Sequence, residues 1–523
     1  MDNRNKVHTS FNVEVVWQDR SSARSILAAI VLVGLLSARL VYTTFITNTK
    51  PLEQPLIINS FSRTVRKRFH AWMFLFNGPR IIQDRFDKAN GRSFEVLAPD
   101  NRYVFVSSVK HIKELDTAPD TVLSLQAASK QMLQPVYTMH GFNWFDRRGT
   151  EGVGFVRALR TLLTNNLPQI LPDLGVIVRT RFMELHSTHT TQNAKNEQFM
   201  ESALAYIEET LICAEIVRLI PKFLVPFIGG IIAWRLKSHE TVFDTLLPIA
   251  EQRCQERDLQ NIGQAVPEHA DCIQWIMATS PRQNPWTAKR VVHELMAIWF
   301  GSVHALSTTI TFAFHDICIH PEYVQPLREE LQTKYGAFER TGTGLPLLDS
   351  FIKESARLTP VESMSTRRSA LQPFTLSDGT KVSPGDWACT PVRAIMQSAE
   401  YYPEPMKFYG FRFVDSTILL KSASSNLNFR QPVASKFTDV NQAWHVWGTG
   451  RMACPGRYYA SAVMKVIIGQ VLKNYDCKLA KPVGPCSATL RSSRHSVATL
   501  RLGVNIDHEL QTESLPSLLQ HAD

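Results

Sequence analysis

The chain has 523 residues, of which 44% are hydrophobic and 20% are charged, so it is long and apolar enough to bury a substantial core. Its formal net charge of +10 suits nucleic acid, an anionic membrane surface or an acidic protein partner. No zinc-finger spacing, RNP pattern or basic-aromatic repeat accompanies this charge, which argues against nucleic acid. The eight cysteines lack paired spacing and indicate reduced thiols without a disulfide framework.

An apolar stretch near the N-terminus predicts a single transmembrane anchor. Residues 25–45 are long enough to cross a bilayer if Arg39 reaches the headgroup region. A cleaved signal peptide is the alternative, disfavoured because a mostly polar tail, residues 1–24, precedes the stretch. Residues 46–60 are interpreted as a linker. The basic residues that follow place the large remainder, residues 61–523, in the cytoplasm by the positive-inside tendency.

The first half of this remainder is predicted to be mostly helical. Residues 93–108 contain two β-rich runs around an Asp-Asn turn, which predicts a hairpin in a small sheet. Residues 156–178 have the pattern of an amphipathic helix with interruptions. Residues 221–234, rich in Pro and Gly, are predicted to be an apolar loop. Such a loop serves either as an entrance for an apolar ligand that also contacts lipid or as a buried connector.

The second half contains the longest predicted helix, residues 287–319. Thr287 caps it and His320-Pro321 ends it, and because apolar residues lie on nearly every side we expect it to be buried. Residues 375–392 carry two turn signals, DG and PG, between β-formers and predict another short sheet. A further helix is predicted over residues 458–472.

A glycine-built loop places one thiol just before that last helix. The loop reads WGTGRMACPG, from Trp447 to Gly456. Gly448, Gly450 and Gly456 let the backbone pass close to a flat group and adopt positive φ. The N–H groups and dipole of the following helix would stabilise a thiolate at Cys454. Taken alone, such a loop is more often a turn with a buried structural cysteine.

Two upstream motifs favour the functional interpretation. In the first, Glu354 and Arg357 are three residues apart, which puts a carboxylate and a guanidinium on one helix face. Alone, this spacing is usually a solvated surface pair. In the second, Arg412 lies between two phenylalanines after a Pro-rich turn.

These motifs, in this order, resemble those of the cytochrome P450 monooxygenases, whose loop pattern is aromatic-Gly-x-Gly-x-(Arg/His)-x-Cys-x-Gly. The resemblance implies a mostly α cytochrome P450 fold with small β-sheets and haem (heme, iron protoporphyrin IX) as the cofactor. It makes Cys454 the iron ligand. Arg157 or Arg160 could then reach a haem propionate, or lie on a solvated face. The resemblance also implies haem contacts at Trp447, Gly448, Gly450, Arg451 and Gly456, and a buried fold-locking cluster of Glu354, Arg357 and Arg412.

The sequence departs from the family at two places. Met452 stands where the family usually has Arg or His to bind a propionate, and Arg451 could substitute. In the central helix, the family's small residue is kept as Gly301, but His304 replaces the acid and Ala305 the alcohol of the oxygen-handling motif. His304 could carry protons, because histidine gains and loses a proton near physiological pH, or be a core residue bonded to a carbonyl.

By this resemblance, the protein would oxidise an apolar small molecule, a terpenoid or other secondary metabolite, with O2. NADPH-cytochrome P450 reductase would supply the electrons. The overall sequence is similar to those of fungal microsomal members of the family. This similarity implies that the chain lies in the endoplasmic reticulum membrane, with its catalytic domain facing the cytosol. The missing acid-alcohol pair keeps alternatives open: an isomerase, dehydratase or oxidative coupling enzyme, or a non-catalytic haem protein.

Overall fold

The structure is a computed structural model that describes residues 56–144, 154–186, 194–221, 223–281, 283–421, 434–479 and 504–505. The predicted membrane anchor, residues 25–45, lies outside the described residues. The first described helix, α2 (Leu56–Ala89), begins inside the predicted linker of residues 46–60 and is kinked at Asn77, just before Pro79. A proline inside a helix removes a backbone hydrogen bond and bends the axis.

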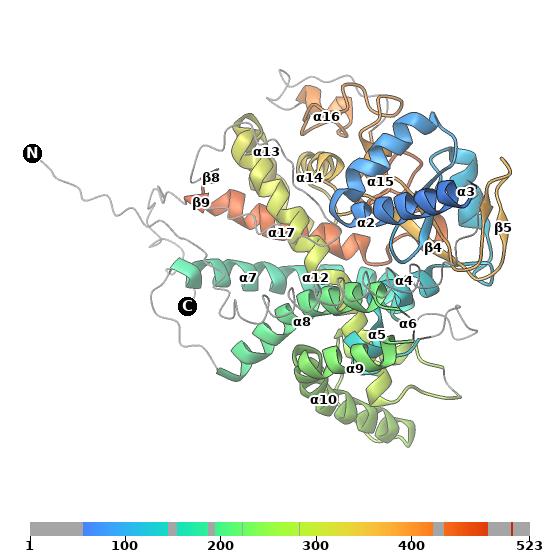
Figure 1. The fold of residues 1–523 in the computed structure, drawn as a ribbon. Coiled ribbons are helices and arrows are strands. Elements are labelled where there is room, and N and C mark those ends of the chain that lie inside the picture. The colour runs from blue at the N-terminus through green and yellow to red at the C-terminus, as the bar shows by residue number, and fades with distance from the viewer. Residues whose placement is uncertain are drawn as a thin grey trace, which may run out of the picture.

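Helices make up most of the fold (Figure 1). After α2 come α3 (Val109–Thr117), α4 (Leu125–Leu133), α5 (Pro135–Thr138), α6 (Gly154–Arg157), the π-helix η1 (Ala158–Leu163), α7 (Leu167–His186), α8 (Ala194–Leu219), α9 (Val225–Arg235), α10 (Ser238–Asn261) and α11 (Cys272–Ala278). The second half adds α12 (Ala288–Ile319), η2 (Pro321–Tyr323), α13 (Val324–Thr341), α14 (Pro346–Leu358), α15 (Val392–Met396), α16 (Ser416–Lys421), η4 (Gly450–Met452) and α17 (Arg457–Asn474). The interrupted helix over 156–178 and the helix over 458–472 are thus confirmed.

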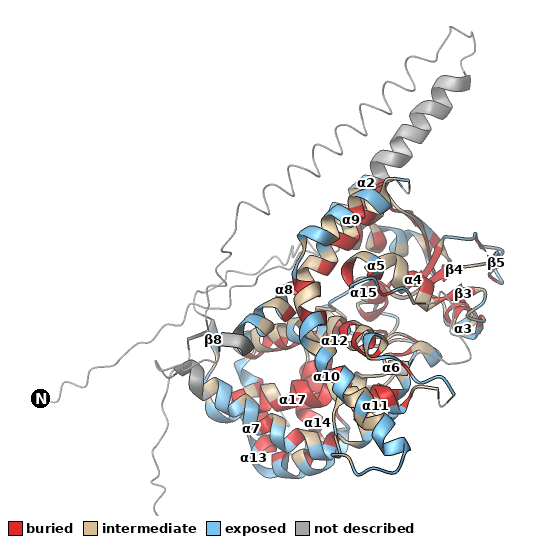
Figure 2. Cartoon of the chain, turned by 90° about the horizontal axis from the view of Figure 1, so that it is seen from below, coloured by how far each residue is buried: buried red, intermediate tan, exposed pale blue. Residues whose placement is uncertain are grey.

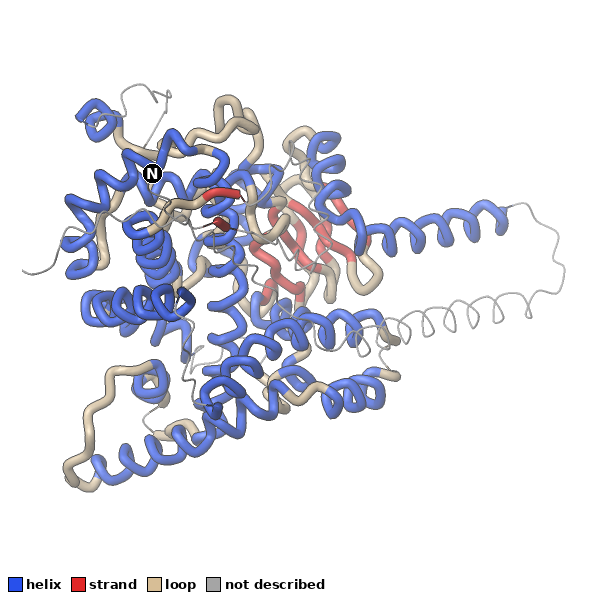
Figure 3. Tube along the Cα trace, turned by 90° about the vertical axis from the view of Figure 1, so that its left-hand side faces the viewer, coloured by secondary structure: helices blue, strands red, loops and turns tan. Residues whose placement is uncertain are grey.

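The main sheet has five strands in the order β1-β2-β7-β4-β3, and its strands gather on one side of the molecule (Figure 3). Its members are β1 (Phe94–Leu97), β2 (Arg102–Phe105), β3 (Leu123–Ser124), β4 (Ser365–Ala370) and β7 (Trp387–Thr390). The β2–β7 pair is parallel and the other pairs are antiparallel. Two small antiparallel pairs complete the strands: β5 (Phe374–Thr375) with β6 (Lys381–Val382), and β8 (Lys478–Leu479) with β9 (Val504–Asn505).

Both predicted β regions are confirmed. The hairpin over 93–108 is β1–β2, with Phe94 opposite Phe105. The region 375–392 supplies the β5–β6 hairpin and then β7, which crosses into the main sheet.

The core lies between α12, α13, α14 and α17, which share one cluster of buried apolar side chains. Residues 347–357 of α14 are all buried, including its charged residues, and α17 is buried along most of its length (Figure 2). Charged groups in such a place need partners, because desolvation of an unpaired charge is costly.

Helix α12 crosses this core as predicted at its ends but not in its middle. Thr287 caps it and His320 ends it. Among the described helices it is the one long and apolar enough to cross a membrane, yet it packs against α8, α10, α14 and α17. The expectation of complete burial is wrong, since Gly301, Ser302 and Ala305 are exposed. A Cβ built on Gly301 would meet no atom within 4 Å, so the surface of α12 at this residue borders open space.

The predicted apolar loop over 221–234 is wrong, because α9 occupies most of it. Pro226 lies in the first turn, where its missing N–H costs nothing. Gly229 is buried against α5, and a Cβ at this position would approach the Tyr137 ring to 2.9 Å. The Pro and Gly content that argued for a loop therefore serves the start and the packing of a helix.

Candidate functional site

The cysteine loop, Trp447–Gly456, is bonded to itself and to the neighbouring chain. The backbone N–H of Cys454 donates to the carbonyl oxygen of Trp447 at 2.7 Å, which closes the loop. The indole Nε1 of Trp447 donates to the carbonyl oxygen of Phe437 at 2.7 Å. Arg457, the first residue of α17, donates through Nη1 to the carbonyl oxygen of Cys454 at 3.0 Å. The loop is thereby fixed relative to α17.

The thiol of Cys454 lies at the N-terminal end of α17. Burial raises the pKa of the Cys454 thiol above its ordinary value. The backbone N–H groups of Gly456 and Arg457, together with the Arg457 guanidinium, act on the pKa of this thiol in the opposite direction. These donors stabilise negative charge on sulfur, as does the positive end of the helix dipole. A thiol in these surroundings suits a metal ion, which holds its ligand deprotonated.

The loop glycines have different surroundings. Gly448 and Gly450 have φ of +79° and +55°, a region that side chains disfavour. A Cβ at Gly456 would meet nothing within 4 Å, and one at Gly448 would meet nothing closer than 3.7 Å. A Cβ at Gly450 would lie 2.7 Å from the Asp116 side chain. Gly456 therefore borders open space, Gly448 lies in ordinary contact with the backbone of Met452 and Ala453, and Gly450 makes room for a neighbouring carboxylate.

The structure brings Glu354, Arg357 and Arg412 together in full burial. Arg357 Nε donates to Glu354 Oε2 at 2.7 Å, and Arg412 Nε donates to Glu354 Oε1 at 2.9 Å. The guanidinium groups also donate to the carbonyl oxygens of Met396, Pro403 and Pro405. Each charge thus has several partners, which offsets the desolvation cost.

A second buried charge on α14 supports the chain beneath the cysteine loop. Lys353 Nζ donates to Ser435 Oγ at 2.9 Å and to the carbonyl oxygen of Lys436 at 2.7 Å. It also lies over the rings of Phe413 and Trp444, at 4.5 and 4.8 Å from their centroids. Burial lowers the pKa of Lys353 to about 8. Sequence reasoning did not identify this contact, because a lysine beside a Glu-x-x-Arg pair resembles any surface lysine.

The middle of α12 is much less constrained. The His304 ring makes no hydrogen bond to any residue in the described part of the chain, so it is not the carbonyl-bonded core histidine of the alternative interpretation. Its carbonyl oxygen accepts from Ser307 Oγ at 3.1 Å, and that of Ala305 accepts from Thr309 Oγ1 at 2.8 Å. Hydroxyl groups near Ala305 are thus directed at helix carbonyls. Gly301 and Ala305 themselves border open space.

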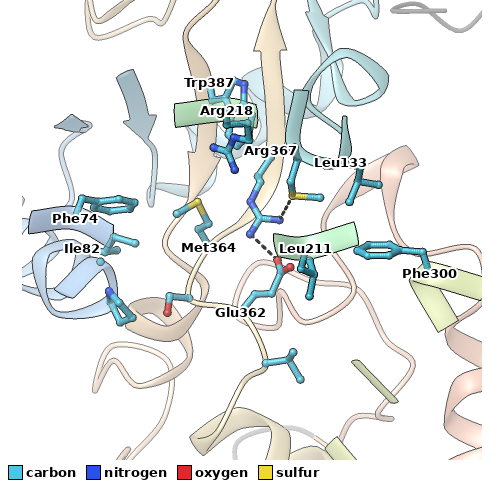
Figure 4. Close-up of a pocket in the computed structure, with 15 residues that line it drawn as sticks. Phe74, Ile82, Leu133, Leu211, Arg218, Phe300, Glu362, Met364, Arg367 and Trp387 are labelled. Atoms are coloured by element: carbon cyan, nitrogen blue, oxygen red, sulfur yellow. Dashed lines mark hydrogen bonds and ion pairs between the residues drawn. The ribbon is translucent and has the colours of Figure 1, made fainter. Parts of the chain in front are cut away.

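A cavity of about 100 Å³ lies between α2, α8, α12 and the main sheet (Figure 4). Its lining is mainly apolar and includes Phe300, which directly precedes Gly301 on α12. Two arginines also line it. Arg367 Nη2 pairs with Glu362 at 2.9 Å, and the Arg218 guanidinium lies 5.2 Å from the Trp387 ring centroid. The cavity is therefore mainly apolar, and the arginines that line it interact with other side chains of the protein.

The predicted propionate-binding arginines lie near the loop but have protein partners. Arg451 Nη2 donates to the carbonyl oxygen of Ala118 at 2.7 Å and pairs with Asp120 at 3.3 Å. Arg160 Nη2 donates to the carbonyl oxygen of Arg451 at 3.3 Å, and Arg157 is exposed.

Sequence reasoning missed three charged residues around the site. Arg367 lines the cavity, and Arg368, on the same strand, is buried and paired with Asp116 at 2.8 Å. The adjacent arginines in a β-rich stretch were a usable signal, since a strand sends neighbouring side chains to opposite faces. Asp116 gave no signal, because its partners are remote in sequence.

Comparison with known proteins assigns the family. The chain matches the family model described as Cytochrome P450 over residues 172–502, more than half of its length. It is 26% identical to cytochrome P450 monooxygenase 151 of Postia placenta, over 77% of this chain and 84% of that protein. It is also 26% identical to cytochrome P450 monooxygenase olcJ of Penicillium canescens, over 77% of each chain. A shorter match, 29% identical over 58% of each chain, is to ent-kaurene oxidase P450-4 of Gibberella fujikuroi.

Proposed function

Because the chain belongs to the cytochrome P450 family, we propose that it is a monooxygenase whose haem iron is bound by Cys454. The family binds haem iron through a thiolate, so this oxidoreductase has haem as its cofactor. The observation that carries Cys454 as the ligand is its position at the N-terminus of α17, with backbone N–H groups directed at its sulfur.

The residues of the cysteine loop fit a haem. Gly456 borders the open space that a flat macrocycle needs, Gly448 allows the positive φ of the loop, and the donor set around Cys454 suits a thiolate. Trp447, Gly450 and Arg451 complete the loop side of the site. When bound, the haem supplies oxygen activation and oxygen transfer to a C–H bond. The cluster of Glu354, Arg357 and Arg412 locks the fold behind it.

The middle of α12 handles oxygen and protons in this proposal. Gly301 leaves room for O2, and the exposed Ala305 supplies no hydroxyl to hold it. The His304 ring, without a hydrogen-bond partner among the described residues, carries protons through ordered water.

The proposed substrate is an apolar small molecule. The cavity beside Phe300 is lined mainly by apolar side chains, which supports this class, but its volume of about 100 Å³ holds only part of a terpenoid-sized molecule. One similar protein is named for the oxidation of ent-kaurene, which supports a terpenoid or another secondary metabolite as the substrate class.

Electrons come from NADPH-cytochrome P450 reductase in this proposal. Arg451 in the cysteine loop and Arg160, which donates to the Arg451 carbonyl oxygen, are both exposed and give this face positive charge. An acidic donor surface would dock there by charge complementarity.

The protein is proposed to lie on the endoplasmic reticulum membrane, with the anchor of residues 25–45 supplemented by α9. Three exposed apolar side chains, Phe227, Ile231 and Trp234, are spaced to share one face of this helix, and Phe223 precedes them. Their exposed fractions of 50–78% exceed what a solvated helix needs, which supports contact with lipid.

A haem-thiolate isomerase, dehydratase or oxidative coupling enzyme is the second candidate, favoured by the absence of an alcohol at Ala305. Sustained NADPH consumption coupled to an oxygenated product supports the monooxygenase. Product formation without NADPH supports the second candidate. Substrate binding without any turnover would indicate a non-catalytic haem protein.

The central test is the carbon monoxide difference spectrum of the reduced holoprotein. We expect a red-shifted, thiolate-type band that Cys454→Ser abolishes. Cys213→Ser, which changes a buried cysteine of α8, is the matched control and should keep the band. A thiolate-type band that persists in Cys454→Ser would refute the assignment.

A further inference from the structure

The C-terminal end of α3 contacts the cysteine loop directly. Asp116, in the last turn of α3, accepts a hydrogen bond from Thr449 Oγ1 at 2.7 Å through its Oδ1. The same oxygen accepts from Arg368 Nη2 at 2.8 Å. One carboxylate thus joins α3, strand β4 and the loop that carries Cys454.

The loop is shaped to admit this carboxylate. A Cβ at Gly450 would lie 2.7 Å from Asp116 Cγ and 2.8 Å from Oδ2, closer than real side chains approach. Gly450 therefore serves two needs at once, a φ of +55° and the close approach of Asp116.

Buried charge holds Asp116 in place. Arg368 is only 1% exposed, and its Nη1 donates to the carbonyl oxygen of Leu115, beside Asp116. On the other side of the loop, Arg451 binds the carbonyl oxygen of Ala118 and pairs with Asp120. Three consecutive loop residues, 449–451, are therefore in direct contact with residues 115–120.

We propose that Asp116 is a positioning residue that fixes the cysteine loop so that Cys454 stays bonded to the haem iron. This inference rests on the proposed function, because it requires Cys454 to be the ligand. The family's loop usually carries Arg or His at the position of Met452 to bind a haem propionate. Here the protein holds the neighbouring residues through α3. Residues that orient a metal ligand through such contacts typically affect metal binding about 10- to 100-fold when removed.

Removal of the carboxylate should weaken the iron–sulfur bond and should also weaken the fold, because it leaves the buried Arg368 without this partner. In Asp116→Ala, Thr449 loses its acceptor and the loop gains freedom. We expect much of the carbon monoxide complex to shift from the thiolate-type to the thiol-type band, and haem to dissociate about tenfold faster or more. Thr449→Val removes the same hydrogen bond without unpairing Arg368, and should give a smaller shift in the same direction.

Two further variants separate positioning from stability. Asp116→Asn keeps an oxygen that can accept from Thr449 but removes the charge that pairs with Arg368, so it should lower Tm while largely keeping the thiolate-type band. Asp271→Ala is the matched control elsewhere, because Asp271 also accepts from an arginine, Arg253 at 2.7 Å, and from a backbone N–H, that of Gln274. It should lower Tm and leave the band unchanged.

The outcomes distinguish this inference from the proposed function. If the wild-type protein lacks a thiolate-type band, the proposed function fails. If the wild-type band is present and both Asp116→Ala and Thr449→Val keep it in full with wild-type haem retention, the positioning role of Asp116 is refuted. If Asp116→Ala does not fold, Thr449→Val and Asp116→Asn still decide the question, because the inference requires Thr449→Val to lose more of the band than Asp116→Asn.

Discussion

The cysteine loop and the middle of α12 are held in opposite ways. Around the loop, Trp447 and Thr449 donate to residues outside it, and Arg457 of α17 donates to the Cys454 carbonyl oxygen within it. In the middle of α12, Gly301 and Ala305 border open space, and the nearby hydroxyls bond only to the carbonyl oxygens of their own helix.

The region that matches the family's sequence pattern more closely is also the region with more contacts to the rest of the fold. The loop keeps the pattern except at Met452, and it is tied to the rest of the fold by buried groups. The middle of α12 departs at two adjacent positions, and one of them, Ala305, is exposed. A substitution in α12 therefore changes the surface presented to a ligand without disturbing the fold, whereas a substitution in the loop region must also accommodate its partners.

The largest expected effect comes from breaking the buried cluster that supports the loop side. Glu354→Ala leaves the guanidinium groups of Arg357 and Arg412 buried without a counter-ion. Removal of one member of a buried ion pair costs about 3–5 kcal/mol, a large part of the stability of a typical protein. We expect little or no soluble holoprotein, measured as haem content per protein and as Tm.

The exposed pair on α10 is the matched control for that variant. Glu240 and Lys237 form an ion pair at 3.0 Å with largely exposed side chains. Glu240→Ala should cost less than about 1 kcal/mol. Equal losses in the two variants would show that the buried cluster does not lock the fold.

The second largest expected effect is a loss of stability in acid, caused by a buried histidine close to the cysteine loop. His445 is fully buried, its Nε2 donates to the carbonyl oxygen of Gln442, and burial lowers the pKa of His445 to about 4 from its ordinary value of 6.5. The unfolded chain therefore binds this proton more readily than the folded protein. The free energy of unfolding is unaffected well above pH 6.5 and falls as the pH drops from 6.5 towards 4, by about 3 kcal/mol in total.

The measurement compares Tm between pH 7 and pH 4.5 in the wild type and in His445→Asn. The half-buried His293 contributes as well, because burial also lowers its pKa to about 4. Only the difference between the two proteins isolates His445. A smaller fall of Tm in His445→Asn is expected, and identical pH profiles would contradict the assignment.

The same contrast explains what the sequence could predict. Local signals were sufficient where partners are close in the chain, as for the Thr287 cap and the hairpin of β1 and β2. They failed where the partner is remote: Thr449 and Asp116 are 333 positions apart, and no periodicity connects them. The cluster at Glu354 was predictable only through the resemblance, since spacing alone cannot distinguish a buried pair from a solvated one.

The prediction of a loop at the position of α9 was wrong for another reason. Glycine and proline lower helix propensity on average, but here Pro226 lies in the first turn and Gly229 packs against Tyr137. Propensity is a weak prior that tertiary contacts override. The exposed apolar face of α9 was likewise visible only once its residues were known to be helical.

The smallest expected effect tests the α12 side. Ala305→Thr restores an alcohol at an exposed position, so the fold should be largely unchanged. One hydrogen bond contributes about 1 kcal/mol, which corresponds to about a fivefold change in a rate. In enzyme reconstituted with reductase, we expect the hydrogen peroxide released per NADPH consumed to fall by up to about that factor, because the new hydroxyl assists proton delivery.

Ser307→Ala is the control, since its hydroxyl donates to the His304 carbonyl oxygen and should not affect the ratio. His304→Gln should raise the peroxide ratio if the imidazole carries protons. An unchanged ratio in both Ala305→Thr and His304→Gln would mean that neither position governs proton delivery, and would favour the chemistry without conventional oxygen activation.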